Sequence, residues 1–190
     1  MKRPAVFVTL LLALVSVLAA QTLTARIEGE QLHIVAPRVH LLTGEAFQRL
    51  HDGATVNYEL QLTARADKAG KALARAIARF AVSYDLWEEK YAITRLNGTP
   101  KSVSRLTAAA AEAWCVDNTS MPIVALPPSQ PFWIRLEYRA EPSGIPSEQS
   151  ENSSSTLSSL VDIFSRRPRT EQVHGSEDLG PVRLGDLRKR

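Results

Sequence analysis

The chain has 190 residues, of which 44% are hydrophobic and 23% are charged, and its formal net charge at pH 7 is +3. This composition supports a folded core and does not indicate a strongly basic surface, so we predict no nucleic-acid partner. The single cysteine, Cys115, excludes an internal disulfide.

Residues 1–20 have the pattern of a secretory signal peptide. Lys2 and Arg3 form a positive start, the apolar run Val6–Leu18 follows, and small residues at 18–20 offer a cleavage site. The alternative is an uncleaved anchor, but this apolar run is shorter than the roughly 20 residues that a spanning helix needs. We therefore predict an exported protein, periplasmic or extracellular. Loss of Lys2 and Arg3 reduces the 23 basic residues to 21, against 20 acidic ones.

The next segments predict two short strands and a short helix. Thr22–Glu28 and Gln31–Val35 flank a turn at Gly29, which is typical of a hairpin. Gly44–Leu50 has helical spacing of apolar residues. We expect three of its side chains to face the core: Ala46, Phe47 and Leu50.

Three consecutive segments predict an antiparallel meander. Ala54–Ala64 alternates apolar and polar residues, which indicates a strand with one buried face. Ala74–Tyr84 repeats this period, the chain reverses near Asp85–Glu89, and Lys90–Leu96 leaves as a third strand.

An alanine-rich stretch predicts one helix of medium length. Ser102 or Ser104 is placed to cap its start, and the helix is expected to run to about Val116. Cys115 then lies near the helix C-terminus, and we interpret it as a small buried residue rather than a reactive thiol.

Further along, Phe132–Arg139 alternates again and predicts another strand, with Trp133 on its outer face. An outward Trp at this place either marks a contact surface or covers a sheet edge.

Composition changes after residue 141. Residues 142–156 are rich in Ser and predict a flexible linker, residues 157–167 predict a short amphipathic helix, and residues 168–190 predict a disordered tail. Membrane contact is expected only through Arg166–Arg169. The apolar face of the short helix consists of Leu157, Leu160, Val161 and Phe164.

The sequence has no glycine-rich phosphate loop, nucleophile elbow or zinc-binding helix motif. Three acids at the predicted reversal, Asp85, Glu88 and Glu89, are interpreted as solvated rather than catalytic. None of the histidines has metal-like spacing, so we predict no metal, no cofactor and no enzyme activity. These histidines are His33, His40, His51 and His174.

Two stretches and the alanine-rich helix carry a resemblance to a known family. Arg49–Gly53 before a long strand and Phe80–Tyr91 around the reversal resemble an exported bacterial family catalogued only as domain of unknown function 4390. The resemblance covers Gln21–Glu141. It implies a secreted or periplasmic β-rich domain, without an assigned reaction or active site.

The expected fold is mainly β (α+β): an antiparallel β-sandwich or curved meander sheet of about seven strands with one medium helix, spanning residues 21–141. The leading function hypothesis is a non-catalytic protein that binds or helps assemble an envelope component. The identity of its protein partner and its own oligomeric state stay open. The alternative is a carrier that holds a lipid or small apolar ligand between sheet and helix. The candidate contact residues are Trp87, Trp133, Leu157, Leu160, Val161 and Phe164.

Overall fold

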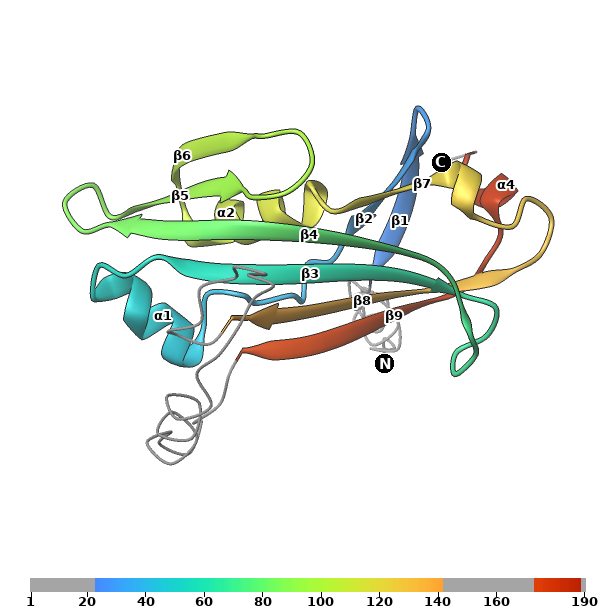
Figure 1. The fold of residues 1–190 in the computed structure, drawn as a ribbon, viewed down its shortest axis with the longest axis horizontal. Coiled ribbons are helices and arrows are strands. Elements are labelled where there is room, and N and C mark those ends of the chain that lie inside the picture. The colour runs from blue at the N-terminus through green and yellow to red at the C-terminus, as the bar shows by residue number, and fades with distance from the viewer. Residues whose placement is uncertain (1–22, 142–172, 189–190) are drawn as a thin grey trace, which may run out of the picture.

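A computed structural model of the chain describes residues 23–141 and 173–188 (Figure 1). The predicted signal peptide, the predicted linker and the predicted amphipathic helix with Leu157, Leu160, Val161 and Phe164 lie outside the described residues.

The described residues form nine strands, three α-helices and one 3-10 helix. The strands are β1 (Thr24–Glu28), β2 (Gln31–Val35), β3 (Val56–Arg65), β4 (Ala72–Asp85), β5 (Lys90–Arg95), β6 (Ser102–Leu106), β7 (Ser120–Pro122), β8 (Phe132–Ala140) and β9 (His174–Val182). The helices are α1 (Gly44–His51), α2 (Ala108–Asp117), the 3-10 helix η2 (Ile123–Ala125) and α4 (Leu184–Leu187).

The strands form two antiparallel sheets. One has six strands in the order β6-β5-β4-β3-β8-β9, and the other has three in the order β1-β2-β7. The predicted mainly β fold with one medium helix is confirmed, and so is the β3-β4-β5 meander. The described strands number nine rather than about seven, because the sequence does not predict β6 and β9.

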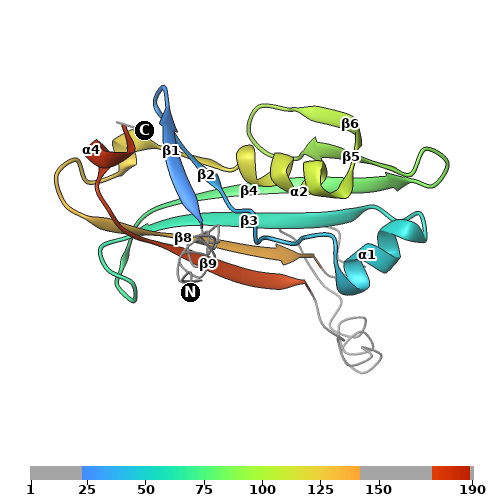
Figure 2. The same ribbon diagram turned by 180° about the vertical axis from the view of Figure 1, so that it is seen from behind.

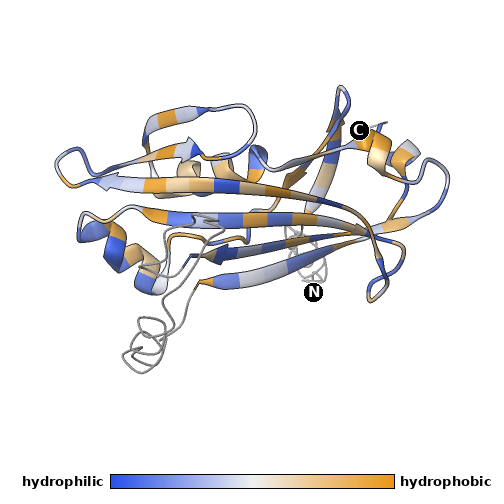
Figure 3. Cartoon of the chain, viewed as in Figure 1, coloured by the Kyte–Doolittle hydropathy of each residue, from blue (hydrophilic) through white to orange (hydrophobic). Residues whose placement is uncertain are grey.

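The core lies between the two sheets. Helix α2 and the three-stranded sheet are on the far side of the six-stranded sheet in Figure 1, and Figure 2 shows them in front of it. One hydrophobic cluster joins Leu32 and Met121 of the small sheet to Leu60 and Phe80 of the large one. Apolar and polar residues alternate along the long strands (Figure 3), so each strand has one face toward this core.

Strand β3 lies in the middle of the large sheet and follows the predicted alternation. Tyr58, Leu60 and Leu62 are fully buried on its inner face. On the outer face Glu59 is also buried, because Arg79 donates to one of its carboxylate oxygens at 2.9 Å and Arg139 to the other at 2.7 Å. A carboxylate needs such partners when it leaves water.

Two local predictions for the helices are wrong. Ser102–Leu106 forms strand β6 rather than the start of a helix, and α2 begins after Thr107, whose hydroxyl accepts a hydrogen bond from the backbone N–H of Ala110 at 3.3 Å. A nearby cap thus replaces the predicted Ser102 or Ser104. In α1, Ala46 and Leu50 are buried as predicted, but Phe47 is 40% exposed.

The prediction of a disordered tail at 168–190 is wrong for residues 174–187. Strand β9 pairs with β8 from Arg139↔His174 to Phe132↔Val182, and α4 follows it. The physical reason is that the few apolar residues of this segment all pack in or against the hydrophobic core. Leu184 and Leu187 are buried in the core, so the folded domain does not end at residue 141.

We expect the replacement of Leu187 by Ala to lower the free energy of unfolding by about 2 kcal/mol, since the change removes a buried side chain and leaves a cavity. Urea unfolding followed by circular dichroism measures this change. Arg188→Ala is the neighbouring control, and it should change stability by less than about 0.5 kcal/mol because Arg188 is exposed. Equal stability of Leu187→Ala and the wild-type protein would show that α4 is not part of the cooperative core.

Candidate functional site

The most exposed large aromatic side chain of the described residues lies at the tip of the hairpin between β4 and β5. Trp87 is 96% exposed, and its neighbour Leu86 is 55% exposed. We call residues 85–90 the hairpin tip. Figure 1 shows that it forms one end of the molecule along the longest axis.

The hairpin tip is held by hydrogen bonds to one carboxylate. An oxygen of Asp85, Oδ1, accepts from the backbone N–H of Trp87 at 2.8 Å and of Glu88 at 3.0 Å. These bonds to the ionised form keep the pKa of Asp85 below its ordinary value. Asp85 therefore closes the turn, as Asp side chains commonly do.

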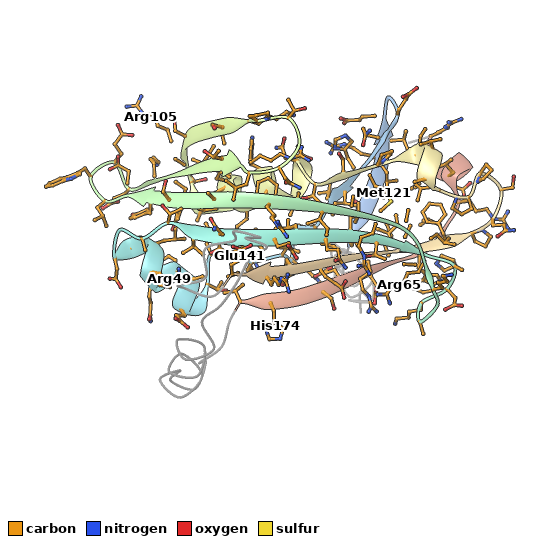
Figure 4. All side chains as sticks on the ribbon, viewed as in Figure 1. Arg49, Arg65, Arg105, Met121, Glu141 and His174 are labelled. Carbon is orange, nitrogen blue, oxygen red and sulfur yellow. The ribbon has the colours of Figure 1, made fainter. Side chains whose placement is uncertain are left out.

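A second contact ties the hairpin tip to the neighbouring strand β6. The Arg105 guanidinium donates to both carboxylate oxygens of Glu88, at 2.7 Å and 3.0 Å. This bidentate pair lowers the pKa of Glu88, and its planar geometry fixes the direction of both side chains. Figure 4 shows Arg105 on β6 beside the hairpin. Asp85 and Glu88, considered above as acids at the reversal, thus shape the turn.

Helix α1 lies at the same end of the molecule and adds a row of rings. The ring of His51 stacks between Phe47 and Tyr84, with both centroid distances 4.0 Å, and Tyr84 contacts Tyr91 at 4.8 Å. Phe47 is half exposed, and Tyr84 lies directly before the hairpin tip in the sequence. This row has no signal in the sequence, because it requires α1 and β4 to meet in space.

The second predicted contact residue, Trp133, is half-buried. Strand β9 passes so close that a Cβ atom on Gly180 would lie 2.9 Å from the indole ring, and the Lys68 ammonium lies 5.9 Å from the ring centroid. The outer Trp of β8 therefore covers its neighbouring strand. Trp87 and Trp133 are not brought together, and a role of Trp133 in binding stays a prediction.

Cys115 is buried in α2, as predicted. Burial, together with the nearby Glu112 carboxylate, raises the pKa of its thiol to about 12.

Among the residues that the structure describes, no group of three or more His, Cys, Asp and Glu side chains is arranged to hold a metal ion.

Three hollows differ in the space that they offer. The crevice between α2 and the large sheet, lined by Leu42, Ile93 and Cys115 among others, holds about 160 Å³ of empty space in gaps too narrow for water. A polar cleft of about 440 Å³ lies over β3, β8 and β9, beside the Glu59 ion pairs. A groove of about 550 Å³ lies beside η2 and α4. The crevice is where the carrier hypothesis places its ligand, and it has no room for one.

The groove beside η2 and α4 was not predicted, because three distant segments form it. We call it the end groove. One of the side chains that line it, that of Val124, is 91% exposed. The apolar residues that line it are Pro122, Ile123, Val124, Leu126, Pro128 and Leu184.

No protein-family model matches the chain, and neither a curated protein nor a solved structure shows significant similarity to it. The resemblance to domain of unknown function 4390 therefore stays a prediction.

In the described ranges, no helix has the length and apolar character required to cross a membrane.

We expect the thiol of Cys115 to react roughly a thousandfold more slowly with a thiol reagent at pH 8 in the folded protein than after unfolding, because little thiolate forms when the pKa is about 12 instead of 9.0. Its raised pKa also means that stability, complete below pH 9, declines as the pH rises toward 12. Fast labelling of the folded protein would contradict the burial of Cys115.

Replacement of Asp85 by Ala should make the backbone amides of Trp87 and Glu88 exchange with solvent several-fold faster, because the acceptor of both bonds is lost. The same loss is expected in the wild-type protein as the pH falls through the lowered pKa of Asp85, because protonation removes the charged acceptor. Hydrogen exchange measured by NMR tests both. Glu89→Ala, an exposed acid of the same turn, is the control and should leave both amides protected.

Proposed function

We propose that this chain is a non-catalytic, exported binding protein that contacts an envelope component through its hairpin tip. The single observation that carries the proposal is the 96% exposure of Trp87 on a turn that Asp85 and the Glu88–Arg105 pair hold in one shape. Trp is enriched among the residues that contribute most to binding free energy at protein interfaces.

The hydrogen-bonded shape of the turn supports the proposal that Trp87 is exposed in order to bind a partner. Ordering a flexible loop opposes association, and a turn that is already ordered avoids much of this entropy loss. Leu86 on the tip and the half-exposed Phe47 at the same end extend the apolar surface that a partner can cover. A protein partner suits this end, because its charges include Asp85, Glu88 and Glu89 and it is not basic enough to favour an anionic membrane.

The chemistry of the nearby side chains supports a binding role without catalysis. Asp85 and Glu88 have lowered pKa values, the opposite of a carboxyl group that donates a proton near neutral pH. The buried Cys115 is held as a thiol rather than as a nucleophilic thiolate. Export rests on the sequence of residues 1–20, and membership in domain of unknown function 4390 rests on the sequence resemblance; both are part of the proposal.

A photo-crosslinking side chain placed at position 87 tests the proposal in envelope extract of the source cell. We expect one defined protein adduct, which excess wild-type protein prevents and excess Trp87→Ala protein does not. Placement of the same side chain at Leu73, which is 47% exposed near the other end of β4, is the matched control and should give no such adduct. Equal adducts from both positions, or none from position 87, would refute the hairpin tip as a contact surface.

A further inference from the structure

Positive charge gathers at the end of the large sheet where β3 turns into β4. We call residues 63–75, 133–135 and 178–180 the basic end. The residues that the structure describes contain equal numbers of basic and acidic side chains, whereas the basic end has an excess of basic ones. Its basic residues are Arg65, Lys68, Lys71, Arg75 and Arg135, and its acidic residues are Asp67 and Asp178.

The register of the strands brings several of these side chains onto the outer face of the sheet. Arg75 on β4 and Arg135 on β8 both lie opposite Thr63 of β3. Asp178 on β9 lies opposite Arg135. Arg65 is two residues beyond Thr63 on β3, so it shares the same face. Figure 4 shows Arg65 at this end of the sheet.

Most of the basic side chains at this end have no acidic partner. Arg135 donates to both carboxylate oxygens of Asp178, at 2.7 Å and 2.9 Å. The Asp67 carboxylate accepts from the backbone N–H of Ala69 at 3.0 Å, within its own hairpin. In the described part of the chain, no carboxylate lies within ion-pair distance of the other four basic residues, which are Arg65, Lys68, Lys71 and Arg75.

Apolar surface lies among these cations. Leu73 is 47% exposed, and the Lys68 ammonium lies 5.9 Å from the centroid of the half-buried Trp133 ring. Exposed cations beside a Leu and a Trp suit the surface of an anionic bilayer, because Trp prefers the headgroup region and basic side chains are attracted by lipid phosphates.

The arrangement of the cations favours a broad anionic surface over a small anion. None of the three hollows described above is lined by a residue of the basic end. The cations come from β3, β4, β8 and the β3–β4 hairpin, and they are spread over one end of the molecule. A small ligand is held by groups that converge on a cavity, whereas a plane of lipid headgroups meets all of these side chains together.

The two ends of the long strand β4 differ in charge. Figures 1 and 2 show the β3–β4 hairpin and the hairpin tip at opposite ends of the molecule. Strand β4 has 14 residues, so its two ends lie about 45 Å apart. This separation is several times the screening length of about 8 Å in physiological salt. The hairpin tip carries three acids that Lys90 and Arg105 offset only in part: Asp85, Glu88 and Glu89.

We propose that the basic end binds the surface of an anionic phospholipid membrane and that the hairpin tip points away from it. The contact is peripheral, since the Lys and Arg side chains meet lipid phosphates while Leu73 and the edge of Trp133 reach the headgroup region. It is separate from the contact predicted for Arg166–Arg169. The inference does not require the hairpin tip to have a partner, but it explains why a tip that binds an envelope protein lies at the far end of β4.

Co-sedimentation with vesicles tests this contact, with the protein and its variants purified from the source cell. Vesicles of phosphatidylglycerol and phosphatidylcholine supply the anionic surface, and vesicles of phosphatidylcholine alone supply the neutral one. Lys68→Gln combined with Lys71→Gln removes two exposed charges of the basic end, so this variant should keep the wild-type melting temperature. Lys90→Gln combined with Lys101→Gln is the control, because it has the same net charge and its replacements lie outside the basic end.

We expect the wild-type protein to bind the anionic vesicles and not the neutral ones, and to bind more weakly as the salt concentration rises. The variant of Lys68 and Lys71 should bind roughly 25-fold more weakly, because each Lys near an anionic surface strengthens binding about fivefold. The control variant should lose less than roughly threefold, since screening weakens the attraction of distant charges.

A dye attached to an introduced cysteine shows the orientation, because the buried Cys115 reacts slowly with thiol reagents. An environment-sensitive dye on Leu73→Cys should shift its emission to the blue when anionic vesicles are added. The same dye on Trp87→Cys should keep the emission that it has in water. A response at position 87 without one at position 73 would show that the tip meets the membrane and would overturn the inference.

Equal binding of the Lys68 and Lys71 variant and its control would also overturn the inference, and so would equal binding to both kinds of vesicle. Absence of binding to the anionic vesicles would overturn it as well. In that case an acidic protein is the alternative ligand, shown by a protein adduct from position 73 that the Lys68 and Lys71 variant loses. The proposed function fails separately, because it is measured by the adduct from position 87.

Discussion

The pairing of β3 along both of its edges is the constraint on which the rest of the structure depends. Strand β3 pairs with β4 and with β8 over most of its length, and Glu59 on its outer face binds one Arg of each neighbour. The last pair between β3 and β4 is Val56↔Val82, so the end of β4 continues to Asp85 with β5 as its only partner strand. This overhang carries the hairpin tip beyond the end of β3.

The elements that could be predicted from sequence are those whose signal is local. The alternation of β3 and β4 and the short reversal between β4 and β5 depend on neighbouring residues, and they are present in the fold. Strand β9 could not be predicted in this way, because His174–Val182 is rich in residues that disfavour strands and it is ordered by pairing with β8. The missing strand also explains Trp133, whose outward position on β8 does not reveal that β9 passes beside it.

The features of the candidate site also divide into those with a local sequence signal and those that depend on tertiary contacts. The exposure of Trp87 follows from its place in a polar reversal, and the sequence was enough to predict it. The contact that holds Glu88 comes from Arg105, 17 residues away, and the stacking of His51 on Tyr84 joins a helix to a strand. The end groove needs η2 and α4 together, and α4 lies in the segment that the sequence predicts to be a disordered tail. Such contacts depend on the arrangement of the sheets rather than on any local pattern.

The contacts around the hairpin tip contribute more to its shape than to the stability of the fold. Arg105 and Glu88 keep much of their side chains in water, and exposed ion pairs of this kind add little to the free energy of unfolding. Folding also leaves the indole of Trp87 in water, so the hydrophobic free energy of that side chain is gained only when another surface covers it. Since the turn is already ordered by Asp85, association would lose little loop entropy and would retain most of that gain. Because these residues lie outside the core, substitutions in the tip are expected to have little effect on the stability of the β3-centred sheet.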